Sequence, residues 1–187
     1  MKAGVLALQG CIDPHLKMLA RAGAEPVAVR TLRQLESVER IILPGGESTT
    51  MLRLLEKNQL TAALREFGKT RPLWGVCAGA ILAAQEVTSP EQFSLGLIPI
   101  RARRNFYGSQ TDSFKSTLQV DFLNSPLAVD FIRAPLLEPL SREVQVHASL
   151  DSQPVLLQHG RILVSSFHVE LGQDIRLHEY FLKISAA

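Results

Sequence analysis

The chain has 187 residues, a length that fits one domain or one domain with a small addition. Hydrophobic residues make up 46% and charged residues 20%, the balance of a globular protein that buries a core. The net charge of +2 is too small to indicate nucleic acid or a membrane surface as a partner. No apolar run approaches the roughly 20 residues that span a bilayer. The two cysteines, Cys11 and Cys77, predict no disulfide framework and fit the reducing cytoplasm.

Short apolar runs alternate with amphipathic segments through the first half of the chain. Strands are expected at 3–8, 26–29, 40–43 and 72–76, and helices after residue 13, around 51–55, at 60–67 and at 80–85, with a short turn or helix at 32–38. This order is typical of an α/β fold with an open, mostly parallel sheet and helices on both faces. Ligands of such sheets bind beyond the carboxyl ends of the strands, so residues that follow the strands are expected to converge there.

Local residue types predict where several helices begin and end. Asp13 is expected to cap the first helix, with Pro14 at its first position. Ser48 or Thr49 is expected to cap the helix that follows the third strand. Gly68 is expected to end the next helix.

The second half of the chain predicts added antiparallel strands beside or on the parallel sheet. The runs that indicate strands lie at 114–122, 129–132, 144–148, 155–157 and 161–166. The turn Gln158-His159-Gly160 predicts a hairpin between the last two runs. A loop is expected at 135–139 and a closing helix at 172–184. Without repeats or a linker, the sequence predicts a single domain over 1–187.

Cys77 follows a predicted strand inside the pattern Gly75-Val76-Cys77-Ala78-Gly79. A nucleophile between two glycines, at a strand-to-helix turn, is the nucleophile-elbow pattern with sulfur in place of a hydroxyl. Glycine is needed because the tight turn leaves no room for a Cβ beside the strained residue. The alternative is that Cys77 is a buried, small hydrophobic residue, as free cysteines often are.

His168 is the histidine that best fits the base of such a nucleophile. A thiol nucleophile needs a base, and the base needs a group that orients it. Glu170 lies two positions after His168, and side chains at i and i+2 of an extended segment project to the same side, with Cα atoms roughly 6–7 Å apart. The alternative for so short a pattern is a surface histidine beside an unrelated carboxylate.

Backbone N–H groups near the two glycines Gly45 and Gly46 are candidate donors to an oxyanion. Ala78, directly after the cysteine, is expected to supply one donor, and Gly46 another because no side chain blocks its approach. The alternative is an ordinary strand-to-helix turn. The sequence has no phosphate-binding loop of the G-x-x-x-x-G-K-[ST] type and no zinc spacing, so no metal or cofactor is predicted.

Arginines form a small cluster at 101–105, and Arg133 follows the run 129–132. A guanidinium binds a carboxylate through paired hydrogen bonds, so these residues are candidates for a carboxylate clamp. The alternative for the cluster is a solvated loop.

Several segments together resemble the class I (triad) glutamine amidotransferases and, within them, the family of glutaminase subunits of pyridoxal 5′-phosphate synthase. The segments are Gly4 to Gly10 (GVLALQG), Leu43 to Met51 (LPGGESTTM), Gly75 to Gly79 (GVCAG), Arg104 to Gln110 (RNFYGSQ), Asp112 to Phe114 (DSF), Phe131 to Pro135 (FIRAP) and Ser166 to Leu171 (SFHVEL). The resemblance implies a flavodoxin-like α/β fold and a cytoplasmic enzyme that hydrolyses L-glutamine to L-glutamate and ammonia without a cofactor.

The resemblance also implies roles for individual residues. Cys77 would attack the side-chain amide of glutamine, and His168 and Glu170 would complete the triad. Glutamine contacts would fall on Gly46, Glu47, Ser48, Arg104, Ile132 and Arg133. Ammonia would pass to a separate synthase subunit, a (β/α)8 barrel that builds pyridoxal 5′-phosphate, and family assemblies contain twelve copies of each subunit. A flip of the Gly45-Gly46 peptide on partner binding is a further hypothesis.

Two positions depart from the family pattern. Val169 stands where the family usually has proline, which keeps the segment extended but makes it less rigid. Cys11 stands where a small residue is usual and is interpreted as a packing residue. Two alternatives stay open: the glutaminase subunit of another enzyme, such as imidazole glycerol phosphate synthase, and a non-catalytic binding module on the same scaffold.

Overall fold

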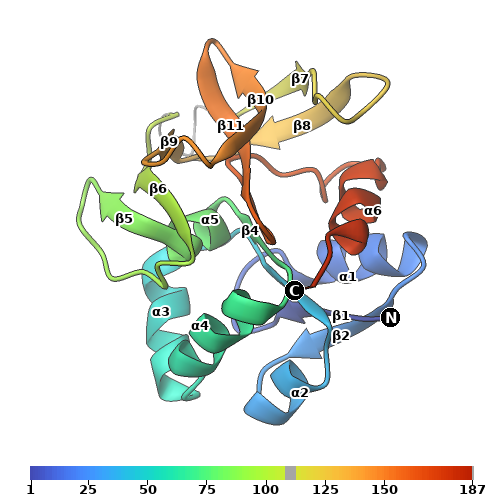
Figure 1. Ribbon diagram of the computed structural model, residues 1–187, viewed down its shortest axis with the longest axis vertical. Coiled ribbons are helices and arrows are strands. Elements are labelled where there is room, and N and C mark those ends of the chain that lie inside the picture. Colours follow the sequence, from blue (N-terminus) through green and yellow to red (C-terminus); the bar gives the residue numbers. More distant parts are fainter. Residues whose placement is uncertain (108–112, 187) are drawn as a thin grey trace.

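The computed structural model of the protein describes residues 1–107 and 113–186 (Figure 1). The helices are α1 (Ile12–Arg21), α2 (Leu32–Glu36), α3 (Ser48–Lys57), α4 (Thr61–Thr70), α5 (Ala78–Ala83) and α6 (Arg176–Lys183). The strands are β1 (Lys2–Leu6), β2 (Glu25–Val29), β3 (Arg40–Leu43), β4 (Leu73–Val76), β5 (Ala84–Thr88), β6 (Ile98–Arg103), β7 (Phe114–Leu118), β8 (Leu127–Phe131), β9 (Leu136–Pro139), β10 (Gln145–Leu150), β11 (Gln153–His159) and β12 (Ile162–Ser165).

The central layer is a seven-stranded sheet in the order β10-β11-β12-β4-β3-β1-β2. The strands from β12 to β2 are parallel to one another, and β11 pairs antiparallel with both β12 and the edge strand β10. The predicted open, mostly parallel sheet and the hairpin between β11 and β12 are therefore confirmed. The late strand β12 lies directly beside β4, so the last third of the chain completes the sheet that the first half begins.

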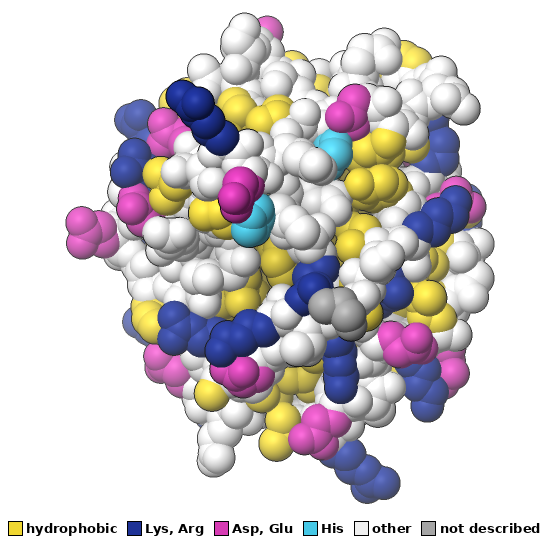
Figure 2. Space-filling model, viewed as in Figure 1, with side chains coloured by type: hydrophobic (Ala, Val, Ile, Leu, Met, Phe, Trp, Pro, Cys, Tyr) yellow, Lys and Arg dark blue, Asp and Glu magenta, His cyan; other side chains and the backbone are white. Residues whose placement is uncertain are grey.

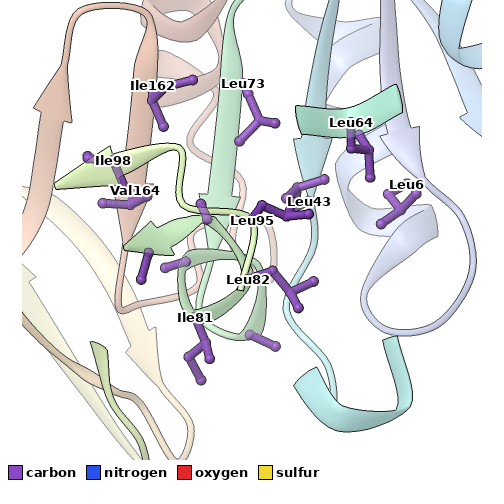
Figure 3. Packing of buried hydrophobic residues seen from close by; sticks show 14 of the residues in the cluster. Leu6, Leu43, Leu64, Leu73, Ile81, Leu82, Leu95, Ile98, Ile162 and Val164 are labelled. Atoms are coloured by element: carbon purple, nitrogen blue, oxygen red, sulfur yellow. The ribbon is translucent and has the colours of Figure 1, made fainter. Parts of the chain in front are cut away.

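Alternate residues of the sheet point into two separate hydrophobic clusters. Ile41 and Leu43 of β3 belong to one cluster, which also takes in residues of α2, α3, α4, α5 and β6 (Figure 3). Ile42 between them belongs to the other, which takes in residues of α1, α6, β7 and β8. Strands buried on both faces explain the continuous apolar runs, and the predicted two-sided covering is confirmed.

Of two small sheets, sequence reasoning missed the one made of β5, β6 and β9 and predicted both strands of the other, β7 and β8. Strand β9, which lies where a loop was predicted at 135–139, pairs antiparallel with β6 as an edge strand. Pro139 is tolerated at its end because an edge strand does not need every N–H. The helix predicted at 80–85 stops at Ala83, and β5 follows and pairs with β6. The second small sheet is the β7–β8 hairpin, whose first strand is shorter than the predicted run 114–122.

Several predicted helix ends are wrong. Helix α1 begins one residue before Asp13, which lies in its first turn and does not cap it. The cap of α3 is Glu47, not Ser48 or Thr49: its carboxylate accepts the N–H of Thr50 at 2.8 Å. Helix α4 continues past Gly68 to Thr70.

Close packing, rather than helix termination, explains Gly68. A Cβ at this position would lie 2.8 Å from the Leu97 side chain. The closing helix α6 begins at Arg176, later than the predicted residue 172. Glycine therefore marks the end of α1, where Gly23 follows the C-cap Ala22 with a φ of 86°, but not the end of α4.

Positive and negative side chains are mixed on the face of the molecule that Figure 2 shows. Lys and Arg lie beside Asp and Glu there and do not form one continuous basic patch. Among the described residues, no helix is long and apolar enough to cross a membrane.

Candidate active site

Cys77 lies at a sharp turn between β4 and α5. Its φ of 49° and ψ of −102° are unusual for a residue with a side chain, as expected for a nucleophile elbow. A Cβ at Gly75 would lie 2.5 Å from the carbonyl oxygen of Gly79, and a Cβ at Gly79 would overlap the carbonyl oxygen of Leu43. Both glycines are required by space, so the predicted elbow geometry is confirmed.

The sulfur of Cys77 faces a cavity and contacts the loop that follows β8. The thiol lies 3.8 Å from the carbonyl oxygen of Ile132 and donates a weak hydrogen bond to it. The N–H of Cys77 donates to the carbonyl oxygen of Ser165 at 2.8 Å, which ties the elbow to the end of β12. The side chain is buried but lines the cavity, so it is not the inert core cysteine of the alternative interpretation.

His168 is held by its backbone beside the end of β8. Its N–H and C=O pair with the C=O and N–H of Asp130 at 2.8 and 2.9 Å. Its Nδ1 lies 2.6 Å from Oε1 of Glu170, and because a carboxylate only accepts, Nδ1 donates. Nε2 is then free to serve a thiol. The side chain of Val169, between the two, is buried in the core, and this packing holds the extended segment in place of a proline.

Burial and close partners set the charges of this pair. Burial lowers the pKa of His168, but hydrogen bonding with Cys11, Cys77 and Glu170 outweighs burial and raises the pKa well above its usual value. Burial raises the pKa of Glu170, but His15 and His168 outweigh it and lower the pKa to about 2. At neutral pH the carboxylate is therefore charged, and His168 readily takes up a proton.

Cys11 also contacts His168, so its interpretation as a packing residue is incomplete. The sulfur of Cys11, a ring nitrogen of His168 and an oxygen of Glu170 lie within 4.8 Å of one another. This is the grouping among the described residues whose spacing suits a metal. The Glu170 oxygen already accepts the Nδ1–H of His168, and the pair lies beside the Cys77 thiol. The hydrogen bond between His168 and Glu170 therefore accounts for the close spacing of these two residues.

A cavity of about 300 Å³ opens over Cys77 and His168. Its lining consists of Gln9, Cys11, Gly46, Glu47, Ser48, Cys77, Ala78, Ile81, Arg104, Asn105, Ile132, Arg133 and His168. All predicted glutamine contacts and both predicted oxyanion donors are among these residues, whereas Glu170 lies behind His168, away from the cavity. The segments after β1, β3 and β4 thus meet at one edge of the sheet, as their order predicts.

Gln9 organises the loop after β3, a function that sequence reasoning missed. Its side-chain oxygen accepts the N–H of Glu47 at 2.8 Å, and a Cβ at Gly46 would lie 2.5 Å from the same oxygen. The carbonyl oxygen of Gly45 accepts the N–H of Cys11 at 2.8 Å, which fixes the direction of the Gly45-Gly46 peptide in this structure. In the sequence, Gln9 lies in the segment GVLALQG, directly after the first predicted strand. This position at a strand end was the signal that could have identified it as a site residue.

The arginine cluster divides between the surface and the cavity. Arg101 lies in β6 and pairs with Glu86 on the surface, 2.8 Å away. Arg104 lines the cavity, with Nη2 3.4 Å from Oε1 of Glu47. Arg133 also lines it, on an exposed turn with φ of 46°. Residues 108–112, part of the segments that carried the family resemblance, lie outside the described residues.

Comparisons with known proteins agree with this arrangement. The chain is 49% identical over 187 residues to a protein of Solibacter usitatus named "Pyridoxal 5'-phosphate synthase subunit PdxT", covering 97% of each chain. The protein of the same name in Oenococcus oeni is 43% identical, covering 99% of this chain and 97% of the relative.

Solved structures give the same result. The fold matches a crystal structure of a glutamine amidotransferase with a TM-score of 0.91 and 42% identity, covering 97% of each chain. A structure of PurLQS from Thermotoga maritima, at 16% identity and a TM-score of 0.73, shares the fold alone. Residues 5–186 match the SNO glutamine amidotransferase family, and the chain therefore belongs to that family.

Proposed function

We propose that this protein hydrolyses L-glutamine to L-glutamate and ammonia through a thioester on Cys77. The observation that carries the proposal is the chain of contacts from the Cys77 thiol through the His168 ring to the buried Glu170 carboxylate. A nucleophile, a base within reach of it and a group that orients the base are the components that acyl transfer from an amide requires.

The proposed reaction passes two protons through His168, one in each half. Nε2 of His168 takes the thiol proton as the sulfur attacks the side-chain carbonyl carbon of glutamine. The same proton then goes to the departing nitrogen, which leaves as ammonia. Water attacks the thioester, His168 takes its proton and returns it to the sulfur, and glutamate leaves. Glu170 stays ionised throughout and holds the Nδ1–H of His168.

The cavity residues supply the remaining roles. The N–H groups of Gly46 and Ala78 are the proposed donors to the oxyanion of the tetrahedral intermediate. Arg104 and Arg133 are the proposed partners of the α-carboxylate of glutamine, because a guanidinium pairs with a carboxylate. Glu47, a carboxylate at the same cavity, suits the α-ammonium group. Ser48 and Ile132 complete the proposed glutamine contacts.

The ammonia is proposed to serve a synthase subunit that makes pyridoxal 5′-phosphate, and so vitamin B6. Relatives that carry the name of a synthase subunit, at 43–49% identity over nearly the full chain, support this assignment. The partner is proposed to be a (β/α)8 barrel in an assembly of twelve copies of each subunit, located in the cytoplasm. The chain is proposed to act in it as a single glutaminase domain over residues 1–187.

Ammonia release from glutamine by the chain mixed with its synthase partner tests the proposal. A Cys77→Ala variant is expected to lose activity by about 10³-fold or more, because no other group replaces the sulfur. A glutamine-analogue electrophile is expected to label Cys77 and not Cys11, which peptide mapping by mass spectrometry distinguishes. Undiminished ammonia release by Cys77→Ala, or an adduct on Cys11 alone, would overturn the proposed roles.

A further inference from the structure

Two histidines lie behind the triad, in a buried cluster that the proposed reaction does not use. His15 of α1 and His178 of α6 are both fully buried. Both pack edge-on against Trp74 of β4, with ring centroids 5.7 and 5.0 Å away. Polar groups without access to water are costly unless they have partners, so two buried imidazoles require an explanation.

The polar contacts of the two imidazoles lead from His178 to His15 and from His15 to Glu170. Nδ1 of His15 lies 3.0 Å from Nε2 of His178, which is hydrogen-bond distance. Nε2 of His15 lies 3.6 Å from Oε1 of Glu170, slightly longer than a hydrogen bond, and among the described residues it has no hydrogen-bond partner. The side chain of Glu170 is likewise fully buried. The contacts form a continuous line from His178 through His15 and Glu170 to His168.

Only one arrangement of protons satisfies this line when both histidines are neutral. A carboxylate accepts and cannot donate, so Nε2 of His15 must carry a hydrogen to interact favourably with Glu170. Nδ1 of a neutral His15 is then an acceptor, and Nε2 of His178 donates to it. Burial lowers the pKa of both histidines, more than Glu170 raises it, which keeps them neutral.

We propose that His15 is a positioning residue for the triad, and that its Nε2–H holds the Glu170 carboxylate in place while His178 fixes the required tautomer. The inference deepens the proposed function and rests on it, since it concerns how Glu170 is held. His15 and His168 both face Oε1 of Glu170, and Oε2 has no hydrogen-bond partner among the described residues. Without the Nε2–H of His15, His168 alone would hold this carboxylate, and the orientation of the His168 ring would be less well fixed. Groups behind a reacting residue commonly set its geometry in this way.

The alternative role for His15 is aromatic packing against Trp74, and two variants separate the two roles. His15→Phe keeps a ring but has no N–H. His15→Gln lacks the ring but offers an N–H toward Glu170 and an oxygen toward His178. A positioning role therefore predicts that the Gln variant is the more active, and a packing role predicts that the Phe variant is.

The experiment measures glutamine hydrolysis by the complex of chain and synthase partner as a function of pH. His15→Phe is expected to lower kcat by about tenfold with KM changed less than twofold, because the cavity residues are untouched. Loss of the N–H raises the pKa of Glu170, so the acidic limb of the kcat profile is expected to move to higher pH. His15→Gln is expected to keep both kcat and the acidic limb close to those of the unaltered protein.

The other titratable groups near His15 and Glu170 are the same in both variants, so they do not cause a difference between the two pH profiles. They are His168, Cys11, Cys77, His178 and Asp174. His147→Phe serves as the control, because this largely buried histidine pairs with Asp121 and makes no contact with the triad in the described structure. Its kcat and acidic limb are expected to match those of the unaltered protein.

Three outcomes would overturn the inference. They are an unchanged kcat and acidic limb in His15→Phe, a Gln variant as impaired as the Phe variant, and a Phe variant more active than the Gln variant. If His15→Phe does not fold, the acidic limb of His15→Gln decides: an unshifted limb supports the inference and a shifted one overturns it. An active Cys77→Ala variant would instead refute the proposed function.

Discussion

A single buried carboxylate organises the charges of the site. Glu170 accepts a hydrogen bond from His168 and faces His15, and both raise the acidity of its carboxyl group against the effect of burial. Three histidines share this region but differ in charge. The pKa of His168 is raised by its hydrogen-bond partners, whereas burial lowers the pKa of His15 and of His178. Histidine therefore has two roles here: His168 accepts a proton, and His15 and His178 stay neutral behind Glu170.

The buried, neutral His178 makes stability depend on pH in a predictable direction. Burial, and then the nearby His15, lower its pKa to about 3 from the ordinary value of 6.5. Between those values the unfolded chain binds a proton that the folded chain does not, so acid destabilises the fold. His178→Phe is expected to flatten the fall in unfolding free energy from pH 6.5 to about 3, by up to about 1.4 kcal/mol per pH unit.

Urea unfolding of the two proteins at several pH values between 3.5 and 7 provides the measurement, and the difference in slope is the quantity of interest. Other acidic groups titrate in the same range, but they are present in both proteins and cancel in the comparison. Equal slopes would contradict a depressed pKa for His178.

At the scale of elements, the elbow between β4 and α5 depends on two glycines, which have no side chain to separate α5 from β3 and β4. Gly75 and Gly79 allow the backbone of α5 to lie against β3 and β4, and this contact pushes Cys77 into its strained conformation. Helix α5 is six residues long and gives way directly to β5. The elbow is thus a property of three packed elements.

Gly79→Ala is expected to separate α5 from β3, because the added Cβ overlaps the carbonyl oxygen of Leu43. Overpacking of this kind costs about 1–3 kcal/mol of unfolding free energy. Denaturant unfolding measures that loss, and the displaced elbow is expected to reduce labelling of Cys77 by a glutamine-analogue electrophile.

Gly172→Ala is the matched control for this variant. Its added Cβ would meet only the carbonyl oxygen of Val169, at an ordinary 3.5 Å. We expect stability within about 0.5 kcal/mol of the unaltered protein. Equal stabilities for the two variants would show that the elbow tolerates a side chain at Gly79.

At the scale of the whole molecule, strands from distant parts of the chain depend on one another. Strand β12 lies between β4 and β11, so β4 would be an edge strand without the last third of the chain. Trp74 of β4 is fully buried, and its Nε1–H donates to Ser165 of β12 at 3.1 Å. The sheet is therefore expected to form and unfold as one unit, as the proposed single domain requires.

Two unfolding curves that coincide would support the prediction that the sheet unfolds as one unit. Fluorescence of Trp74, the chain's one tryptophan, reports on the centre of the sheet, and far-UV circular dichroism reports on all helices and strands. Both signals are expected to change at the same denaturant concentration with the same steepness. A tryptophan transition clearly separated from the dichroism transition would indicate that the sheet and the added strands unfold independently.

The sequence by itself determined the succession of strands and helices along the chain from β1 to α5, the elbow around Cys77 and the pairing of His168 with Glu170. These features depend on neighbours within a few residues, so apolar runs, flanking glycines and i, i+2 spacing suffice to predict them. The segments that end at Gln9, Gly46 and Cys77 also had to meet, because parallel strands bring their carboxyl ends to one edge.

Only the tertiary structure decided which groups surround the triad. His15 and His178 are separated by 163 positions, and nothing local distinguishes either from an ordinary helix histidine. The contact of Cys11 with His168, the pairing of β9 with β6 and the capping of α3 by Glu47 likewise depend on packing or backbone direction that residue type does not encode. Buried polar groups take whichever partners the fold brings to them, and that choice is made in three dimensions.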